Sequence, residues 1–173
     1  MKKWLKRIAL WLLILIVVGF GAGWLLMRGS LPMLEGELAL DGLSAPATIQ
    51  RDALGVVTID AANETDAMRA LGYVHAQERF FEMDLMRRVS TGELSELFGP
   101  VAIEKDKAQR VHRIRARVEA DLATMAADKR PQLQAYTDGV NAGLSALRVR
   151  PWPYLLLHQQ SKRWEIGDAA LTG

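Results

Sequence analysis

Twenty consecutive residues without a charge, residues 8–27, constrain this chain more than any other feature. A helix of that length measures roughly 30 Å at 1.5 Å per residue, which is about the thickness of the hydrocarbon core of a bilayer. Four basic residues precede the run, and Arg28 follows it. The positive-inside bias then predicts an N-terminus in the cytoplasm and a chain that is extracytoplasmic after Arg28. We therefore predict a membrane anchor over residues 1–28.

A cleaved signal peptide is the main alternative for this segment. The apolar region of a signal peptide usually has about 7–15 residues and ends in a small-x-small site. Only Gly21-Ala22-Gly23 resembles such a site, and further apolar residues follow it. The pattern favours an uncleaved anchor over cleavage, and both over a buried core helix.

Composition and charge indicate a folded domain that does not bind nucleic acid. Hydrophobic residues make up 50% of the 173 residues and charged residues 24%, a balance typical of globular proteins. The net charge of +2 comes from the five basic residues up to Arg28, because 17 basic and 20 acidic residues follow them. The basic excess therefore lies beside the apolar segment, and nothing favours nucleic acid as a partner. The absence of cysteine does not identify a compartment.

We predict a stalk over residues 29–36 and the folded part over residues 37–173. The first patterned feature is a β-hairpin, with strands near residues 47–52 and 56–61. Gly55 supplies the positive φ that the tight connection needs. The buried face of the hairpin is expected to consist of Ile49, Val57 and Ile59.

A long helix should follow the hairpin. Asn63 is a suitable N-cap with Asp66 at the third helical position, and Gly92 ends the helix after about 25 residues. An apolar face, interrupted by Glu78, is predicted for Ala67, Leu71, Val74, Phe81 and Leu85.

Shorter helical segments are predicted further along the chain. Residues 95–98 should form a helical turn. One helix should carry Ile114, Val118, Leu122 and Met125 on one side and end near Asp128. Another should start at Asp128 as its cap, with Pro131 in the first turn, and bury Leu133, Tyr136, Val140, Leu144 and Leu147. Asp168 marks the start of a further helix with room for one turn, so we expect residues 37–173 to be an incomplete domain.

The chemistry of a self-sufficient hydrolase is missing from this sequence. A nucleophile beside a base, or a set of metal ligands at workable spacing, would be needed. The three histidines, His75, His112 and His158, are scattered, and no zinc-protease motif, nucleophile elbow or phosphate-binding loop occurs. We therefore predict no catalytic, cofactor-binding or metal-binding residue within this segment.

Two features of the long helix admit a functional or a structural interpretation. His75 is either a general base or a polar side chain satisfied between helices, and the second is favoured. The pair Arg87-Arg88 is expected to form structural ion pairs. Candidate partners are Asp52, Asp84 and Glu96.

Several sequence blocks closely resemble the opening of the precursor in the penicillin amidase (penicillin acylase) family of N-terminal-nucleophile hydrolases. The blocks lie at residues 49–99, 133–144 and 162–170 and follow the order of the family. They contain Gly-Tyr-Val-His-Ala-Gln at residues 72–77, Gly-Val-Asn at residues 139–141 and Arg163-Trp164, besides the arginine pair. Two departures are Val57-Thr58, where members commonly have Pro-His, and Glu82, where glutamine is frequent.

The resemblance implies an α+β fold, in which this segment is the mostly helical small-chain part of an αββα hydrolase. It implies a precursor, or zymogen, that cleaves itself and frees an N-terminal serine located after Gly173. That serine would hydrolyse the amide of an N-acylated small molecule, such as a penicillin or an acyl-homoserine lactone, with its own α-amine as base. This segment alone should be inactive.

The same resemblance sets the expected partners. They are the large C-terminal acylase chain, the acylated amine substrate and, through residues 8–27, the membrane, with the acylase part on the periplasmic side. No cofactor is required for catalysis, and a structural calcium ion in the full-length protein is an option that the resemblance allows. The rival hypothesis is a non-catalytic, membrane-anchored helical scaffold or partner-binding remnant of the family.

Overall fold

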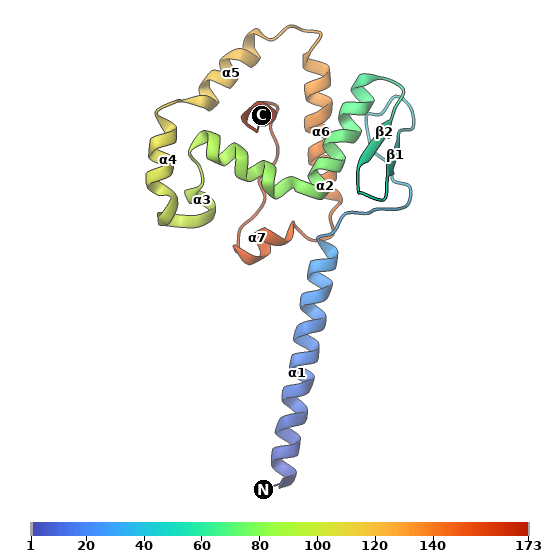
Figure 1. Cartoon of the computed structure of the whole chain (residues 1–173), viewed down its shortest axis with the longest axis vertical. Helices are drawn as coiled ribbons and strands as arrows, with labels where there is room; N and C mark the ends of the chain where they lie inside the picture. The colour runs from blue at the N-terminus through green and yellow to red at the C-terminus, as the bar shows by residue number, and fades with distance from the viewer. Residues whose placement is uncertain (1, 173) are drawn as a thin grey trace.

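The computed structural model describes residues 2–172, which are mostly helical with one small sheet (Figure 1). The elements in chain order are α1 (Lys2–Gly29), β1 (Thr48–Arg51), β2 (Val57–Asp60), α2 (Glu64–Thr91), α3 (Ser95–Phe98), the 3₁₀ helix η1 (Gly99–Ala102), α4 (Ile103–Arg110), α5 (Ile114–Thr124), α6 (Arg130–Ala146), α7 (Trp152–Leu156) and α8 (Asp168–Leu171).

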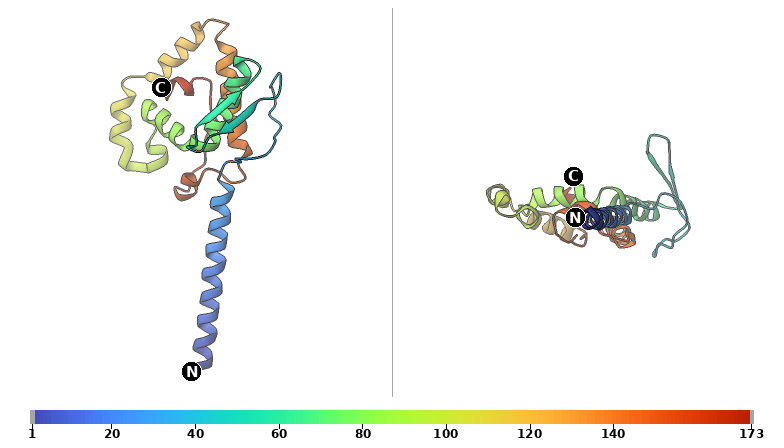
Figure 2. Two further views of the ribbon diagram at one scale, coloured as in Figure 1. Left: turned by 45° about the vertical axis from the view of Figure 1, so that its right-hand side comes forward. Right: turned by 90° about the horizontal axis from the view of Figure 1, so that it is seen from below.

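Helix α1 projects from the remainder of the molecule as a single rod (Figures 1 and 2). Its stretch Lys3–Gly29 has 27 residues and a mean hydropathy of 2.5, and none of it is buried. By length and composition this helix is able to cross a membrane, a property that a signal sequence shares.

The predicted hairpin is confirmed. Strands β1 and β2 pair antiparallel, with Ile49 opposite Ile59 and Arg51 opposite Val57. Gly55 has a φ of 80°, as the connection requires. Ile49, Val57 and Ile59 do alternate with exposed residues on one face, but they are half-buried rather than buried. The hairpin stands out from the helical layer, which explains its incomplete cover (Figure 2).

Both ends of α2 are confirmed. The side chain of Asn63 accepts a hydrogen bond from the backbone N–H of Asp66 at 2.9 Å, and Gly92 ends the helix with a φ of 70°. The sequence did not predict the kink at Arg79, where φ is −142° and ψ is 26°. The kink divides α2 into two arms that pack against different parts of the chain (Figure 1).

The predicted apolar face of α2 is largely wrong. Of its five members only Val74 is buried. The buried stripe lies beside it and combines apolar with polar and charged residues, namely Ala70, Tyr73, Gln77, Phe80, Asp84 and Arg87. Polar side chains enter this stripe because each finds a hydrogen-bonding partner there, which hydrophobic periodicity alone does not indicate.

Close packing of α6 against α2 depends on glycine. A Cβ added to Gly139 would lie 2.0 Å from the backbone oxygen of Arg69, and one added to Gly72 would lie 2.2 Å from the backbone oxygen of Tyr136. Among the large residues predicted to be buried on α6, only Val140 is fully buried, because small residues occupy the contact.

The remaining helices agree in part with the sequence. The turn at residues 95–98 is present as α3. The four residues predicted on the next helix are half-buried, three of them on α5 and Met125 directly after its end at Thr124. Helix α6 begins after Lys129, so the cap predicted at Asp128 is wrong. Helices η1, α4 and α7 were not predicted. Helix α8 is a single turn that starts at Asp168.

The core lies around the kink of α2, where the helix meets α6 and the C-terminal segment. Helices α2 to α6 surround that segment, which passes between them (Figures 1 and 2). The buried members of the core are Ala76, Phe80, Met83, Leu97, Val140, Tyr154 and Trp164. The motif residue Trp164 is therefore a central core residue.

Candidate functional site

The structure brings the motif pair Arg87-Arg88 into an ionic cluster whose inner members are buried and whose outer members, Glu96 and Lys162, are partly exposed. It comprises four cations, Arg87, Arg88, Arg115 and Lys162, and four carboxylates, Asp84, Glu93, Glu96 and Asp168. We call this set the ionic cluster. It joins the end of α2 to the α3 region, to α5 and to the C-terminal segment.

Arg87 is the central cation of the ionic cluster. Its Nε donates to Asp84 at 2.7 Å, and its Nη1 donates to Asp168 and, at 3.1 Å, to the backbone oxygen of Arg163. The guanidinium also lies over the ring of Trp164, 4.9 Å from the ring centroid. All of these partners lie on α2 or in the family block at residues 162–170, which we call the Arg-Trp block. Arg87 therefore connects two sequence blocks that are distant in the chain.

Arg88 forms the second branch of the ionic cluster. Its Nη1 donates to Glu96 at 2.6 Å, and its Nε lies 3.0 Å from Asp84. Burial alone would lower the pKa of Arg88, but the charges and hydrogen bonds of Asp84 and Glu96 raise it. Burial alone would raise the pKa of Glu96, yet its hydrogen bonds to Lys162 and Arg88 lower it. Arg88 and Glu96 therefore both stay ionised and remain paired with each other.

Aromatic side chains close the cluster against the core. Tyr154 donates a hydrogen bond from its hydroxyl to Asp84. Burial and the adjacent charge of Asp84 raise the pKa of Tyr154, so the hydroxyl remains a donor. The aromatic rings of Phe80 and Trp164 lie edge to face, 6.0 Å apart. These groups lie against the pairs of Asp84 with Arg87 and Arg88, whose side chains are at most 5% exposed.

The Gly-Val-Asn motif at residues 139–141 contacts the Arg-Trp block through Asn141. Its amide nitrogen donates to the backbone oxygen of Trp164, and its amide oxygen accepts from the backbone N–H of Trp164, both at 2.9 Å. This paired contact fixes the Arg-Trp block on α6. The sequence placed these blocks in the family but did not predict that they meet.

The predicted structural role of Arg87-Arg88 is thus supported, with one candidate partner corrected. Asp84 and Glu96 are partners, but Asp52 is not. Asp52 instead accepts hydrogen bonds from the backbone N–H groups of Leu54 and Val56, both at 2.8 Å, and closes the hairpin turn. Sequence reasoning missed Asp168 as a partner of Arg87, because 81 residues separate them.

Equal numbers of cations and carboxylates leave no spare charge in the ionic cluster. A site for a charged ligand needs uncompensated charge or unpaired donors directed at the ligand. Here the side chains are paired with each other or with backbone oxygens, although the buried Nε of Arg88, 3.0 Å from Asp84, makes no hydrogen bond. The ionic cluster therefore orients helices relative to one another.

His75 is satisfied between helices. Its Nδ1 lies 3.0 Å from the hydroxyl of Tyr136 on α6, and the two rings are edge to face. Burial and the charge of Arg79 lower the pKa of His75, whereas Glu78 acts in the opposite direction. The contact supports the structural interpretation. His112 and His158 are exposed and lie in separate turns, one between α4 and α5 and the other after α7.

No nucleophile–base pair or metal site is present among residues 2–172. The hydrogen bonds of serine and threonine hydroxyls there involve backbone oxygens, Asp66 or Asn63, and none involves a histidine. No group of three or more His, Cys, Asp or Glu side chains in this range is placed to hold a metal ion.

A hollow of about 580 Å³ lies between α2 and residues 33–49. Such a volume suits a small molecule, which also needs convergent polar groups. The side chain of Gln77 already binds the backbone N–H of Met33 and the backbone oxygen of Gly143, and Arg51 pairs with Glu78. The hollow therefore shows no catalytic arrangement.

Comparison with known proteins places this architecture in a family. The sequence profile described as penicillin amidase matches residues 46–173. Penicillin acylase 2 proenzyme from Pseudomonas sp. (strain SE83) is 40% identical over 139 residues, which are 80% of this chain and 18% of the relative. Acyl-homoserine lactone acylase QuiP from Pseudomonas aeruginosa is 33% identical over 144 residues, 83% of this chain and 17% of the relative.

A solved structure agrees with these sequence relatives. Thermostable penicillin G acylase from Alcaligenes faecalis superposes with a TM-score of 0.65 and 27% identity, covering 73% of this chain and 69% of that chain. This chain spans less than a fifth of the length of the two sequence relatives. On the family profile, the relatives and the shared fold, the chain belongs to the penicillin amidase family.

Proposed function

We propose that this chain is the N-terminal part of a membrane-anchored acylase precursor that hydrolyses the amide bond of an N-acylated small molecule. The observation that carries the proposal is the match over residues 46–173 to penicillin amidases, together with a coverage of only 17–18% of two acylase relatives. The names of those relatives support penicillins, acyl-homoserine lactones or related acylated amines as the substrate class.

In the proposed mechanism, the nucleophile is the N-terminal serine of a large chain encoded after Gly173. Its hydroxyl attacks the amide carbonyl, the amine leaves, and water then hydrolyses the acyl-enzyme. The α-amine of the same serine takes up the hydroxyl proton. An α-amino group has a pKa of about 8, so about a tenth of it is neutral at pH 7 and about half at pH 8. No histidine is needed, in agreement with the contact of His75 Nδ1 with the hydroxyl of Tyr136.

The role proposed for this segment is to support the active site of the large chain. In an αββα fold, its helices would cover part of the sheets that carry the serine. The ionic cluster fixes α2, the α3 region and the C-terminal segment in one arrangement. No cofactor takes part in the proposed chemistry, and a structural calcium ion would bind outside the residues described.

For localisation, we propose that α1 stays uncleaved as a membrane anchor with its N-terminus in the cytoplasm. The four basic residues before the apolar run support this orientation. The acylase part would then face the periplasm. The length and hydropathy of α1 fit an anchor but fit a signal sequence as well, so this part needs its own test.

Sequencing the gene beyond the codon for Gly173 tests the precursor directly. We expect several hundred further codons and a junction such as Gly-Ser, by resemblance to the family. Replacing the junction serine with alanine should abolish both chain cleavage and amide hydrolysis. Retained cleavage would contradict the mechanism. A stop codon directly after Gly173 would favour the non-catalytic scaffold instead.

A further inference from the structure

Helix α1 meets the folded part without a free spacer. The backbone oxygen of Gly29, its last residue, accepts a hydrogen bond from the backbone N–H of Val149 at 3.0 Å. Ser30 is buried, and a Cβ at Gly29 would lie 2.6 Å from the side chain of Val149. The Met33 backbone is also bonded to Gln77 on α2. Residues 29–36, expected as a stalk, are thus held on the folded part at Gly29, Ser30 and Met33, although most of their side chains are exposed.

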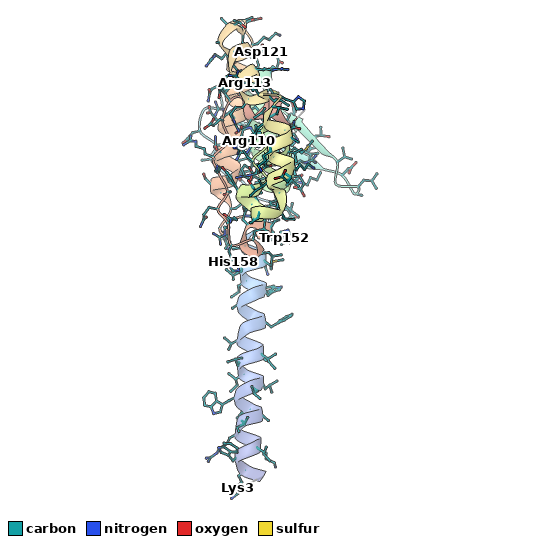
Figure 3. The ribbon with its side chains drawn as sticks, turned by 90° about the vertical axis from the view of Figure 1, so that its left-hand side faces the viewer. Lys3, Arg110, Arg113, Asp121, Trp152 and His158 are labelled. Carbon is teal, nitrogen blue, oxygen red and sulfur yellow. The ribbon has the colours of Figure 1, made fainter. Side chains whose placement is uncertain are left out.

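An apolar surface lies at the level where α1 ends. Helix α7 is beside the C-terminal end of α1, and Trp152 is labelled at the same end of the folded part, far from Asp121 (Figures 1 and 3). Trp152 is 46% exposed and Leu156 is 69% exposed. Leu31, two residues after the end of α1, is 61% exposed. Large apolar side chains that are exposed together mark an interaction surface.

Basic residues accompany these apolar ones. The segment from Leu147 to His158 contains Arg148 and Arg150 and no acidic residue. Arg148 lines a hollow of about 840 Å³ together with Arg28 and Trp24 of α1. The guanidinium of Arg28 lies over the Trp24 ring at 5.1 Å. Arginine binds phosphate oxygens by paired hydrogen bonds, and tryptophan favours the membrane interface.

We propose that residues 147–158, which we call the α7 face, dock on the outer headgroup layer of the bilayer that α1 spans. The proposal rests on the anchoring of α1 proposed above. The bilayer is the occupant because the α7 face continues from the end of the spanning helix, to which Val149 is hydrogen-bonded. Its charge also matches lipid phosphates. Trp152 and Leu156 would enter the interface, and Arg148 would bind phosphate.

Docking would hold the acylase part in one orientation on the membrane. Its C-terminal segment and the hairpin lie away from the α7 face (Figure 1). A large chain that packs on those elements would then sit above the lipid, with its active site at a constant height. An amphiphilic acylated substrate dissolved in the bilayer would meet that site from a constant direction.

Site-directed fluorescence tests the proposal in the full-length precursor. Residues 1–173 contain no cysteine, so single labels can be introduced here once any downstream cysteine is replaced by serine. Leu156→Cys probes the α7 face, Leu15→Cys probes α1, and Val111→Cys is the matched control. Val111 is 74% exposed and precedes Arg113, which lies away from α1 (Figure 3). Each variant carries a bimane label in vesicles of phosphatidylethanolamine and phosphatidylglycerol with brominated acyl chains.

We expect strong quenching at residue 15 and at least about twofold more quenching at residue 156 than at residue 111. Adding Arg148→Glu should reduce the quenching at residue 156 in these anionic vesicles. Equal quenching at residues 156 and 111, with residue 15 quenched, would overturn docking but leave the anchor intact. An unquenched label at residue 15 would overturn both, because α1 would not lie in the bilayer. No effect of Arg148→Glu would refute the role of Arg148 in binding phosphate.

Discussion

Arg87 and Asp168 form an ion pair across 81 residues of sequence, and both side chains are almost fully buried, at 5% and 1% exposure. The pair joins the second arm of α2 to the start of α8. Asp168 also accepts from Arg115 at 3.3 Å and from the backbone N–H of Glu165 at 2.8 Å. The start of α8 is therefore held from two helices at once.

Removing the Arg87 charge should destabilise the protein strongly. Arg87→Met leaves Asp84 and Asp168 buried with one cation each, and breaking a buried pair in this way costs about 3 kcal/mol or more. The free energy of unfolding can be measured by urea denaturation in detergent micelles. The matched control is Lys107→Met, which removes the exposed pair with Glu104 and should cost less than about 0.5 kcal/mol. Equal losses in the two variants would contradict the structural role of the cluster.

A methyl group at Gly139 should separate α6 from α2. Its Cβ would lie 2.0 Å from the backbone oxygen of Arg69, and a backbone atom cannot move aside as a flexible side chain can. We expect Gly139→Ala to lower the free energy of unfolding by about 3 kcal/mol, the upper part of the usual range for overpacking. Gly19→Ala is the control, because nothing lies within 4 Å of the added atom in α1. A thermal midpoint equal to that of the control would contradict the close packing.

Helix ends were predictable from the sequence because they depend on local chemistry. Asn63 caps α2 through its own side chain, and Gly92 takes the left-handed conformation that favours glycine. The same reasoning gave the hairpin turn at Gly55. It failed at Asp128, where the helix begins later and without a side-chain cap. Local signals thus identified the elements themselves but not every one of their boundaries.

The buried face of α2 was not predictable from periodicity. Asp84 is completely buried, a position that a hydrophobic pattern assigns to an apolar residue. Its burial depends on Arg87, Arg88 and Tyr154, and the hydroxyl of Tyr154 comes from 70 residues further along the chain. A helical periodicity contains no information about such distant partners. Family resemblance marked Arg87 and Arg88, whereas Tyr154 lies outside the matching blocks, and only the structure explained why these residues occur together.

The stability of the protein should depend on the protonation of His75. Its pKa is lowered in the folded state, so the unfolded chain binds the proton more tightly. The stabilisation is fully present above the unfolded pKa of about 6.5 and is lost as the pH falls through the lower folded pKa. We expect His75→Gln to remove this loss, as measured by urea midpoints across that interval, whereas His112→Gln at an exposed site should retain it. Carboxylates with lowered pKa, such as Glu96 and Asp106, act only at more acidic pH.

In the full-length precursor, His75 should be dispensable for catalysis. A general base contributes on the order of 10²–10⁴ to the rate, so its loss would be obvious. The His75 ring is instead bonded to Tyr136, and His75→Gln keeps a polar partner for that hydroxyl. We expect kcat for a chromogenic N-acyl anilide to fall by less than about tenfold, with normal chain cleavage. A fall of about a hundredfold or more in a folded, cleaved enzyme would restore His75 as a base. Alanine at the proposed N-terminal serine is the positive control, because it should abolish hydrolysis altogether.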